Sequence, residues 1–347
     1  MKIGETEIGI NKPPFIIAEA GANHNGSLDL AFKLIESAKE VGADCVKFQT
    51  FKTELFCEDR NKTFEYKSQG KVVVQSEFEM FKNLEFNIEE WKRIIKCCKS
   101  NDIKFMTTIQ DPEILDQMLP LGIDSIKVGS DDFDHLINLD YYLKSDLPLI
   151  ISNGMSDLNE TSLVLNFLRK NNYAHKTCVL YCVSLYPCES DKINLKMIED
   201  LKRIYPDFQW GFSDHTISPL TPALAVMNGA CVIEKHFTLD NELPGPDHWF
   251  SVNPSKLKIL IDHVKYAYSS KGLGFANERC DIQQKKIMRR RIIFSRNLEK
   301  GHTLTIDDLR FRRANEGIFP SEIYKVLGKK ITRNVNIGQP LNKEHLN

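Results

Sequence analysis

The sequence has no long apolar run. A transmembrane helix needs about eighteen or more predominantly apolar residues in succession, and no such stretch occurs in the 347 residues. The first residues, 1–14, also lack the apolar core of a signal peptide. We therefore expect a cytoplasmic protein that does not act at a membrane.

Cysteine occurs without a disulfide pattern. Nine cysteines are an odd number, and their spacing suggests no disulfide framework. Cys178, Cys182 and Cys188 are close enough in sequence to raise the question of a zinc site, but the first two fall within or at the end of a predicted strand. We therefore expect free thiols.

Net charge is small but unevenly distributed. The formal net charge is −1. From Asp281 to the C-terminus, 15 lysines and arginines stand against 7 aspartates and glutamates, a balance of +8, which leaves −9 for residues 1–280. The C-terminal section therefore differs in character from the rest of the chain.

One pattern repeats along most of the chain: a short β-rich run, a polar turn, and a longer segment with helical periodicity. The pattern occurs eight times in about 250 residues, which predicts a (β/α)8 TIM barrel. The predicted strands are 15–20, 45–50, 103–108, 125–130, 147–153, 177–182, 208–213 and 230–235. The predicted helices are 28–42, 87–101, 111–122, 136–145, 158–172, 193–205, 219–229 and 253–268.

We expect the barrel domain to span 1–275, a linker to span 276–286, and a small β-rich domain to span 287–347. The last part contains an internal echo, because RNLEKGHTLTIDDL from Arg296 and RNVNIGQPLNKEHL from Arg333 share five residues at matching offsets. Two such copies predict a small domain with pseudo-symmetry.

The connection 51–86 is too long for an ordinary loop between a strand and a helix. Its segment YKSQGKVVVQSE predicts a short hairpin or lid.

Nearly every predicted strand ends on a polar residue. A solvated strand end is the simplest interpretation of each residue alone, and we keep it for Ser152 and Asn153. A complete ring at the C-terminal mouth of a barrel is, however, how this architecture builds an active site. The ring comprises Glu19, Lys47, Gln49, Thr108, Lys127, Ser130, Ser184, Ser213, His215, Glu234 and His236.

The stretch 208–248 carries the strongest signal. Side chains alternate between the faces of a strand, so Ser213 and His215 point one way, and Glu234 and His236 do the same on the next strand. Parallel neighbours lie about 4.8 Å apart, so the two histidines are placed to bind one metal ion. Asp247 follows in a turn.

Lysines and hydroxyl groups in one cavity suit a small anion such as a phosphate or a carboxylate. Lys47 and Lys127 supply the positive charge. A buried lysine could instead form a Schiff base, as in an aldolase. The two histidines favour metal-assisted carbonyl chemistry, with Glu19, Glu234 and Asp247 available for proton transfer.

Several ordered motifs resemble one family. IIAEAGANHNG, DCVKFQTFK, IKVGS, GFSDHT, VIEKHFTLD and GPDH are similar to motifs of the NeuB-type sialic acid synthases, which make N-acetylneuraminate and other nonulosonic acids. The section from IIFSRNLEKGHTLTIDDLRFRRANEGI onward resembles their antifreeze-like SAF domain, which has a β-clip fold.

The resemblance implies a reaction. Phosphoenolpyruvate condenses with an open-chain amino hexose, usually N-acetylmannosamine, to give N-acetylneuraminate and phosphate with C–O cleavage. One divalent ion per active site, Mn²⁺ or alternatively Mg²⁺ or Co²⁺, assists, with His215 and His236 as its ligands. Glu234 handles a proton of the attacking water.

The resemblance also implies the substrate contacts. The residues around phosphoenolpyruvate are Lys47, Thr108, Lys127, Ser130, Ser184 and Ser213. The residues facing the sugar are Glu19, Gln49, Tyr186 and Asp247. A homodimer with swapped SAF domains brings Arg313, or as the second choice Arg312, to the partner's barrel. The positive C-terminal section agrees with a lid over an anionic substrate rather than with nucleic-acid binding.

This chain departs from the family pattern at Ile109, Ser184, Cys188 and Ala314-Asn315. These departures do not affect the predicted reaction, but they leave two classes of acceptor sugar to consider. A 2,4-diacetamido-2,4,6-trideoxy hexose, leading to legionaminic or pseudaminic acid, is the alternative acceptor. A metal-dependent or Schiff-base aldolase is a more distant alternative. A glycan-binding protein whose barrel has no catalytic activity is the alternative that is not an enzyme.

Overall fold

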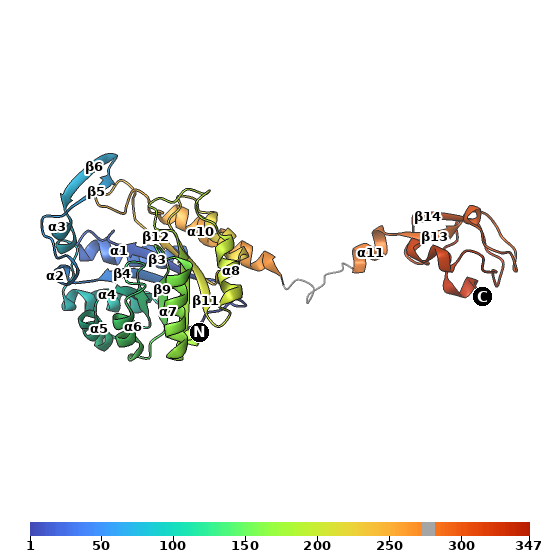
Figure 1. Ribbon diagram of the computed structural model, residues 1–347. Coiled ribbons are helices and arrows are strands. Elements are labelled where there is room, and N and C mark those ends of the chain that lie inside the picture. The colour runs from blue at the N-terminus through green and yellow to red at the C-terminus, as the bar shows by residue number, and fades with distance from the viewer. Residues whose placement is uncertain (273–281) are drawn as a thin grey trace. The chain divides into compact units, whose positions relative to one another are not determined.

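The computed structural model describes residues 1–272 and 282–347 (Figure 1). The chain divides into two compact units, Met1–Gly272 and Leu273–Asn347. Residues 276–281 of the expected linker lie outside the described residues, and 282–286 belong to helix α11, Ile282–Met288. In the described parts of the chain, no helix has the length and apolar character needed to cross a membrane.

The first unit is a closed barrel of eight parallel strands, as predicted. Around the barrel the order is β10, β11, β12, β3, β4, β7, β8 and β9. The strands are β3 Phe15–Gly21, β4 Cys45–Thr50, β7 Lys104–Ile109, β8 Ile126–Val128, β9 Leu149–Ser152, β10 Thr177–Cys182, β11 Gln209–Asp214 and β12 Val232–His236.

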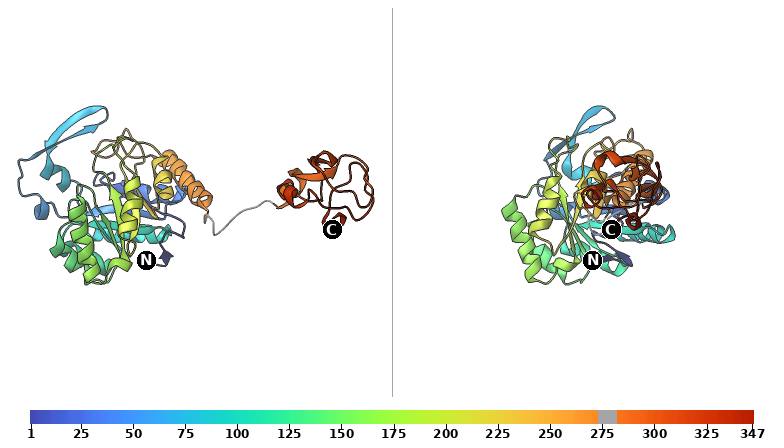
Figure 2. Two further views of the ribbon diagram at one scale, coloured as in Figure 1. Left: turned by 45° about the vertical axis from the view of Figure 1, so that its right-hand side comes forward. Right: turned by 90° about the vertical axis from the view of Figure 1, so that its right-hand side faces the viewer.

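Eight helices cover the outside of the barrel (Figure 2). They are α1 Leu28–Val41, α4 Ile88–Ser100, α5 Pro112–Met118, α6 Leu136–Leu143, α7 Leu158–Lys170, α8 Lys196–Ile204, α9 Thr221–Met227 and α10 Pro254–Lys271. Polar caps fix several starts: the side chains of Ser27, Asn87 and Asp157 accept bonds from first-turn amides, which satisfies donors that have no partner inside the helix.

Alternation along the strands separates the structure into layers. On β3, Ile16 and Ala18 face the helices and belong to the large outer core. Phe15 and Ile17 face the barrel interior, where Ile3 and Ile8 of the N-terminal segment join them. That segment forms a two-stranded ribbon, β1 Lys2–Ile3 and β2 Thr6–Glu7. The interior is therefore apolar at the start of the strands, which leaves their ends for polar groups.

The predicted hairpin is present. Strands β5, Thr63–Ser68, and β6, Lys71–Ser76, pair antiparallel and stand out from the barrel (Figure 1). The short helices α2, Thr53–Phe56, and α3, Glu77–Lys82, flank them.

The second unit contains an antiparallel pair, β13 Arg290–Phe294 and β14 Leu309–Arg313, over its own apolar core. The internal repeat in the sequence corresponds to repeated local structure. Thr305 and Asp308 form a capping box at a 3₁₀ turn, Ile306–Asp308. Asn342 and His345 do the same at the equivalent turn, Lys343–His345.

Gly211 in β11 offers a test of the barrel packing. A Cβ there would lie 2.5 Å from Leu180 Cδ2 and 2.6 Å from the Val232 carbonyl oxygen. Overpacking of this kind costs about 1–3 kcal/mol, so Gly211→Ala should lower the urea midpoint of the barrel unit. Gly9→Ala, whose Cβ would lie 3.4 Å from Gln209 Oε1, is the control. Equal midpoints for the two variants would contradict this packing.

Candidate active site

The strand ends meet in a polar cavity of about 330 Å³. Twelve of the fourteen predicted site residues line this inner cavity, while Asp247 and Arg313 do not. The twelve are Glu19, Lys47, Gln49, Thr108, Lys127, Ser130, Ser184, Tyr186, Ser213, His215, Glu234 and His236. The structure thus brings the predicted ring together; the role of each residue remains a prediction.

Lys47 lies at the centre of a buried charge network. Its Nζ atom is 2.8 Å from Glu19 Oε1 and 3.6 Å from Glu234 Oε2, and it donates to Thr108 Oγ1 at 3.1 Å. Burial alone would lower the pKa of this lysine, but the two carboxylates outweigh that effect and raise it. Lys47 is therefore a fixed cation.

Lys127 is a second buried cation with a different environment. Its ammonium group donates to the Val128 carbonyl oxygen and to Ser152 Oγ, both at 2.8 Å. Burial lowers its pKa. Ser152 and Asn153 are only 3% and 7% exposed, so the expectation that they are solvated strand ends is wrong. Ser152 points into the barrel on the same face of β9 as Ile150, and there its hydroxyl oxygen satisfies the buried ammonium group of Lys127.

The two carboxyl groups beside Lys47 differ in protonation. Burial raises the pKa of Glu19 to about 7. Burial also acts to raise the pKa of Glu234, but Lys127 and Lys47 overcome it and lower the value to about 2. Glu234 Oε1 accepts from Ser213 Oγ at 2.8 Å, whereas its Oε2 makes no hydrogen bond and is buried. One carboxyl group can thus hold a proton near neutral pH while the other is a carboxylate.

The two histidines present a pair of neutral rings. Their centroids lie 5.5 Å apart, and burial lowers the pKa of both. His215 Nδ1 donates to the Val183 carbonyl oxygen at 2.8 Å, which fixes the tautomer with a lone pair on Nε2. Second-sphere bonds of this kind orient metal-binding histidines.

The donor set fits a divalent ion held by two protein ligands. His236 Nδ1 is buried without a hydrogen-bond partner, and the nearest carboxylate oxygen, Asp247 Oδ2, is 3.6 Å away. Residues 1–272 and 282–347 contain no group of three or more His, Cys, Asp or Glu side chains placed around one ion. The remaining coordination positions would therefore go to substrate or water, as in an open catalytic site.

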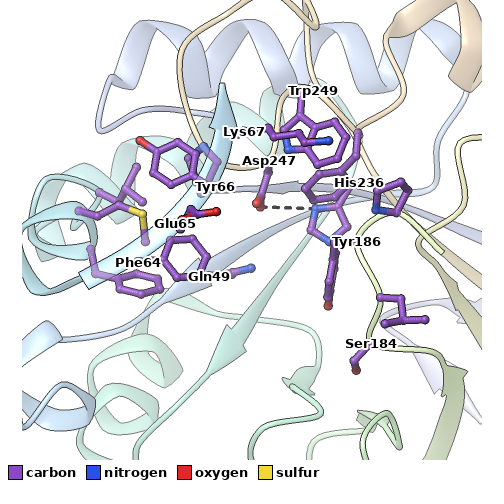
Figure 3. Close-up of a pocket in the computed structure, with 18 of the residues that line it drawn as sticks. Gln49, Phe64, Glu65, Tyr66, Lys67, Ser184, Tyr186, His236, Asp247 and Trp249 are labelled. Atoms are coloured by element: carbon purple, nitrogen blue, oxygen red, sulfur yellow. Dashed lines mark ion pairs between the residues drawn. The ribbon is translucent and has the colours of Figure 1, made fainter. Parts of the chain in front are cut away.

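An outer cavity of about 720 Å³ adjoins the inner one and shares Gln49, Ser184, Tyr186 and His236 with it. Asp247 lines this outer cavity and points toward His236 (Figure 3). Burial raises the pKa of Asp247 to about 6. The Tyr186 ring packs 4.0 Å from the His215 ring. Arg313 ends β14 in the second unit, where it is exposed.

One buried pair was missed by sequence reasoning. Lys235 Nζ lies 2.7 Å from Asp214 Oδ2, and both side chains are almost fully buried. Asp214 and Lys235 immediately precede the two histidines but point to the other face of the sheet. The alternation that placed His215 and His236 inside could also have placed these two outside, next to each other. The pair joins β11 to β12 and so fixes the spacing of the histidines.

The comparisons with known proteins identify the family of this chain. A model described as the NeuB family matches residues 34–275, more than half of the chain, and a SAF domain model matches residues 289–347. The chain belongs to the NeuB family. The family resemblance of the sequence motifs is thereby confirmed, as is the C-terminal SAF domain.

Relatives in the NeuB family cover nearly the whole chain. N,N'-diacetyllegionaminic acid synthase of Legionella pneumophila is 38% identical over 338 residues, 96% of this chain and 94% of the relative. N-acetylneuraminate-9-phosphate synthase of Mus musculus is 31% identical over 333 residues, 93% and 90% of the two chains.

A solved structure shares the fold of this NeuB-family chain. It is the N-acetylneuraminic acid (sialic acid) synthetase from Leptospira borgpetersenii serovar Hardjo-bovis in complex with citrate, with a TM-score of 0.74 and 30% identity. The match covers 82% of this chain and 94% of that chain.

Removal of the Lys235 charge tests the buried pair. Lys235→Met leaves Asp214 buried without its cation, which costs about 3–5 kcal/mol, so the urea midpoint should fall markedly. Lys12→Met, which removes a lysine from an exposed pair with Glu7, should leave the midpoint unchanged. If both variants unfold at the wild-type midpoint, the pair does not hold the strands together.

Proposed function

We propose that this chain is a nonulosonic acid synthase. It condenses phosphoenolpyruvate with the open-chain form of an N-acylated amino hexose and releases inorganic phosphate. The supporting observation is the inner cavity, in which two buried lysines, Lys47 and Lys127, lie beside two neutral histidines in a chain of the NeuB family. The product is N-acetylneuraminate or, from a diacetamido trideoxy hexose, legionaminic or pseudaminic acid. The name of the Legionella relative supports the second acceptor class.

Phosphoenolpyruvate carries a carboxylate and a phosphate, which match the charge and donors of the inner cavity. Lys47 and Lys127 provide the cations, and four hydroxyl groups provide further donors. Ser184 Oγ is buried without a hydrogen-bond partner, so it is available to the ligand. The four hydroxyl groups belong to Thr108, Ser130, Ser184 and Ser213.

His215 and His236 are the residues that would hold Mn²⁺, Mg²⁺ or Co²⁺. Such an ion, when bound, supplies Lewis acidity that polarises the aldehyde of the sugar. The neutral state of both rings is the form that binds metal. Tyr186, packed against the His215 ring, and Gln49, which donates to Glu19 at 3.1 Å, are placed to position the sugar.

The protein's carboxyl groups handle the protons. C3 of phosphoenolpyruvate forms a bond to the aldehyde carbon, water adds at C2, and the C2–O bond to phosphate then breaks to leave the 2-keto acid. Glu234 accepts a proton from that water, because its carboxylate is ionised and its Oε2 atom is free of hydrogen bonds. Glu19, with its pKa near 7, and Asp247 remain as donors toward the new hydroxyl group.

The active form we propose is a cytoplasmic homodimer in which each SAF domain supplies Arg313 to the partner's barrel. The balance of +8 in the C-terminal section supports this arrangement, because a basic domain suits a lid over anionic substrates.

The overall reaction can be tested by phosphate release. Metal-free protein with Mn²⁺ restored should release phosphate from phosphoenolpyruvate with N-acetylmannosamine or with a diacetamido trideoxy hexose, and should release none without sugar or without metal. Phosphate release in the absence of sugar would contradict the proposal. So would the absence of phosphate release with every sugar offered to folded, Mn²⁺-loaded protein.

A Schiff-base aldolase is the second candidate, because burial lowers the pKa of Lys127 and a lowered lysine pKa favours imine formation. Borohydride treatment in the presence of substrate, followed by mass spectrometry, separates the two. The synthase predicts an unmodified chain, whereas the aldolase predicts a reduced adduct on a lysine.

Glu234→Gln tests the proposed base. The change removes the proton acceptor while keeping the shape of the side chain, so turnover should fall by about 10²–10⁴-fold. Mn²⁺ affinity, measured by calorimetry, should stay close to wild type because both histidines remain. A variant that keeps a tenth or more of the wild-type rate would exclude Glu234 as the base.

A further inference from the structure

The outer cavity differs in chemistry from the inner one. The hairpin β5–β6 supplies one wall, and the segment 246–250 supplies a second wall, with Lys67 and Trp249 next to each other (Figure 3). Much of the lining is apolar or aromatic, including Phe64, Val72, Met80, Phe81, Trp249 and Phe250. A ligand that spans both cavities would thus leave the charged network and enter apolar surroundings.

The hairpin wall of the outer cavity has no net positive charge. Among the described residues that line it, Lys67 is the one lysine or arginine, and its Nζ atom lies 5.2 Å from the centroid of the Trp249 ring, in a cation–π contact. Glu65 and Asp247 line the same cavity. The hairpin wall by itself therefore presents one carboxylate, Glu65, against one ammonium group, Lys67, and has no net positive charge to attract a phosphate dianion.

The hairpin is held at its tip by the loop that also carries Asp247. Gln69 Nε2 donates to the Glu242 carbonyl oxygen at 3.0 Å, and Ser68 Oγ accepts from the Gly245 amide at 3.1 Å. At the base, the rings of Phe51, Phe56 and Phe81 pack edge to face. The wall is therefore attached to the barrel at both ends, which a specificity element requires.

We infer that the hairpin wall selects the acceptor sugar, with Val72 and Glu65 as specificity residues, and that the acceptor is an unphosphorylated hexose with apolar substituents. Methyl groups of a deoxy carbon and of N-acetyl groups match the apolar lining, whereas a 6-phosphate at the hairpin wall would meet the Glu65 carboxylate. This inference rests on the synthase function proposed above, and it adds the substrate class and the residues that discriminate.

Two neighbouring valines on β6 provide a matched comparison. Val72 and Val74 are 61% and 59% exposed and lie on the same face of the strand. Of these two described residues, Val72 lines the outer cavity and Val74 does not. Val72→Asp should lower kcat/KM for a 2,4-diacetamido-2,4,6-trideoxy hexose about tenfold or more, and Val74→Asp should change it less than about twofold.

Glu65 tests the charge argument. The acceptors are N-acetylmannosamine, its 6-phosphate and the diacetamido trideoxy hexose, each offered with saturating phosphoenolpyruvate and Mn²⁺. The wild-type protein should use the 6-phosphate least well. Glu65→Lys should raise the ratio of kcat/KM for the 6-phosphate to that for N-acetylmannosamine by about tenfold or more, and Glu65→Gln should give an intermediate ratio.

The outcomes distinguish the two proposals. If the wild-type protein turns over some acceptor but prefers the 6-phosphate, or if the two valine variants behave alike, the inference about the hairpin is wrong and the synthase function stands. If no acceptor supports phosphate release by folded, Mn²⁺-loaded protein, the synthase function fails and this inference fails with it.

Discussion

The buried ammonium group of Lys47 is the constraint on which the site depends. An uncompensated charge inside a barrel is costly, and this one is compensated by Glu19, Glu234 and the Thr108 hydroxyl. Those partners come from three other strands, so the charge fixes their ends relative to one another. The same arrangement separates the pKa values of two carboxyl groups that share one cation. Structural stability and the division of acid and base roles thus have a common origin.

Much of the barrel site follows from the sequence because strand geometry is regular. In a parallel barrel, residues at equal heights become neighbours: Glu19 pairs with Lys47, Thr108 with Lys127, and Ser213 with Glu234. Once eight strands are recognised, alternation alone places these side chains on the inner face. The same rule would have placed Asp214 and Lys235 on the outer face, but their pairing matters only when two outward polar residues are considered together.

Other features depend on contacts that the local pattern does not contain. The hydrogen bond from Lys127 to Ser152, which shows that this strand end is not solvated, joins two neighbouring strands. The position of the hairpin depends on bonds between residues far apart in sequence, such as that from Gln69 to the Glu242 carbonyl oxygen. The length of the connection 51–86 and its segment YKSQGKVVVQSE predict a hairpin, but the direction of the hairpin is decided by where its tip is held.

The two cavities sort the two proposed substrates by charge. Phosphoenolpyruvate requires desolvated cations, which the inner cavity can hold only because carboxylates compensate them in the absence of ligand. The sugar requires a wall that does not compete for phosphoenolpyruvate, and a hairpin wall that is largely apolar, with Glu65 offsetting Lys67, meets this need. Because Tyr186 and His236 line both cavities, the reacting carbons would meet where the charged and the apolar surroundings join.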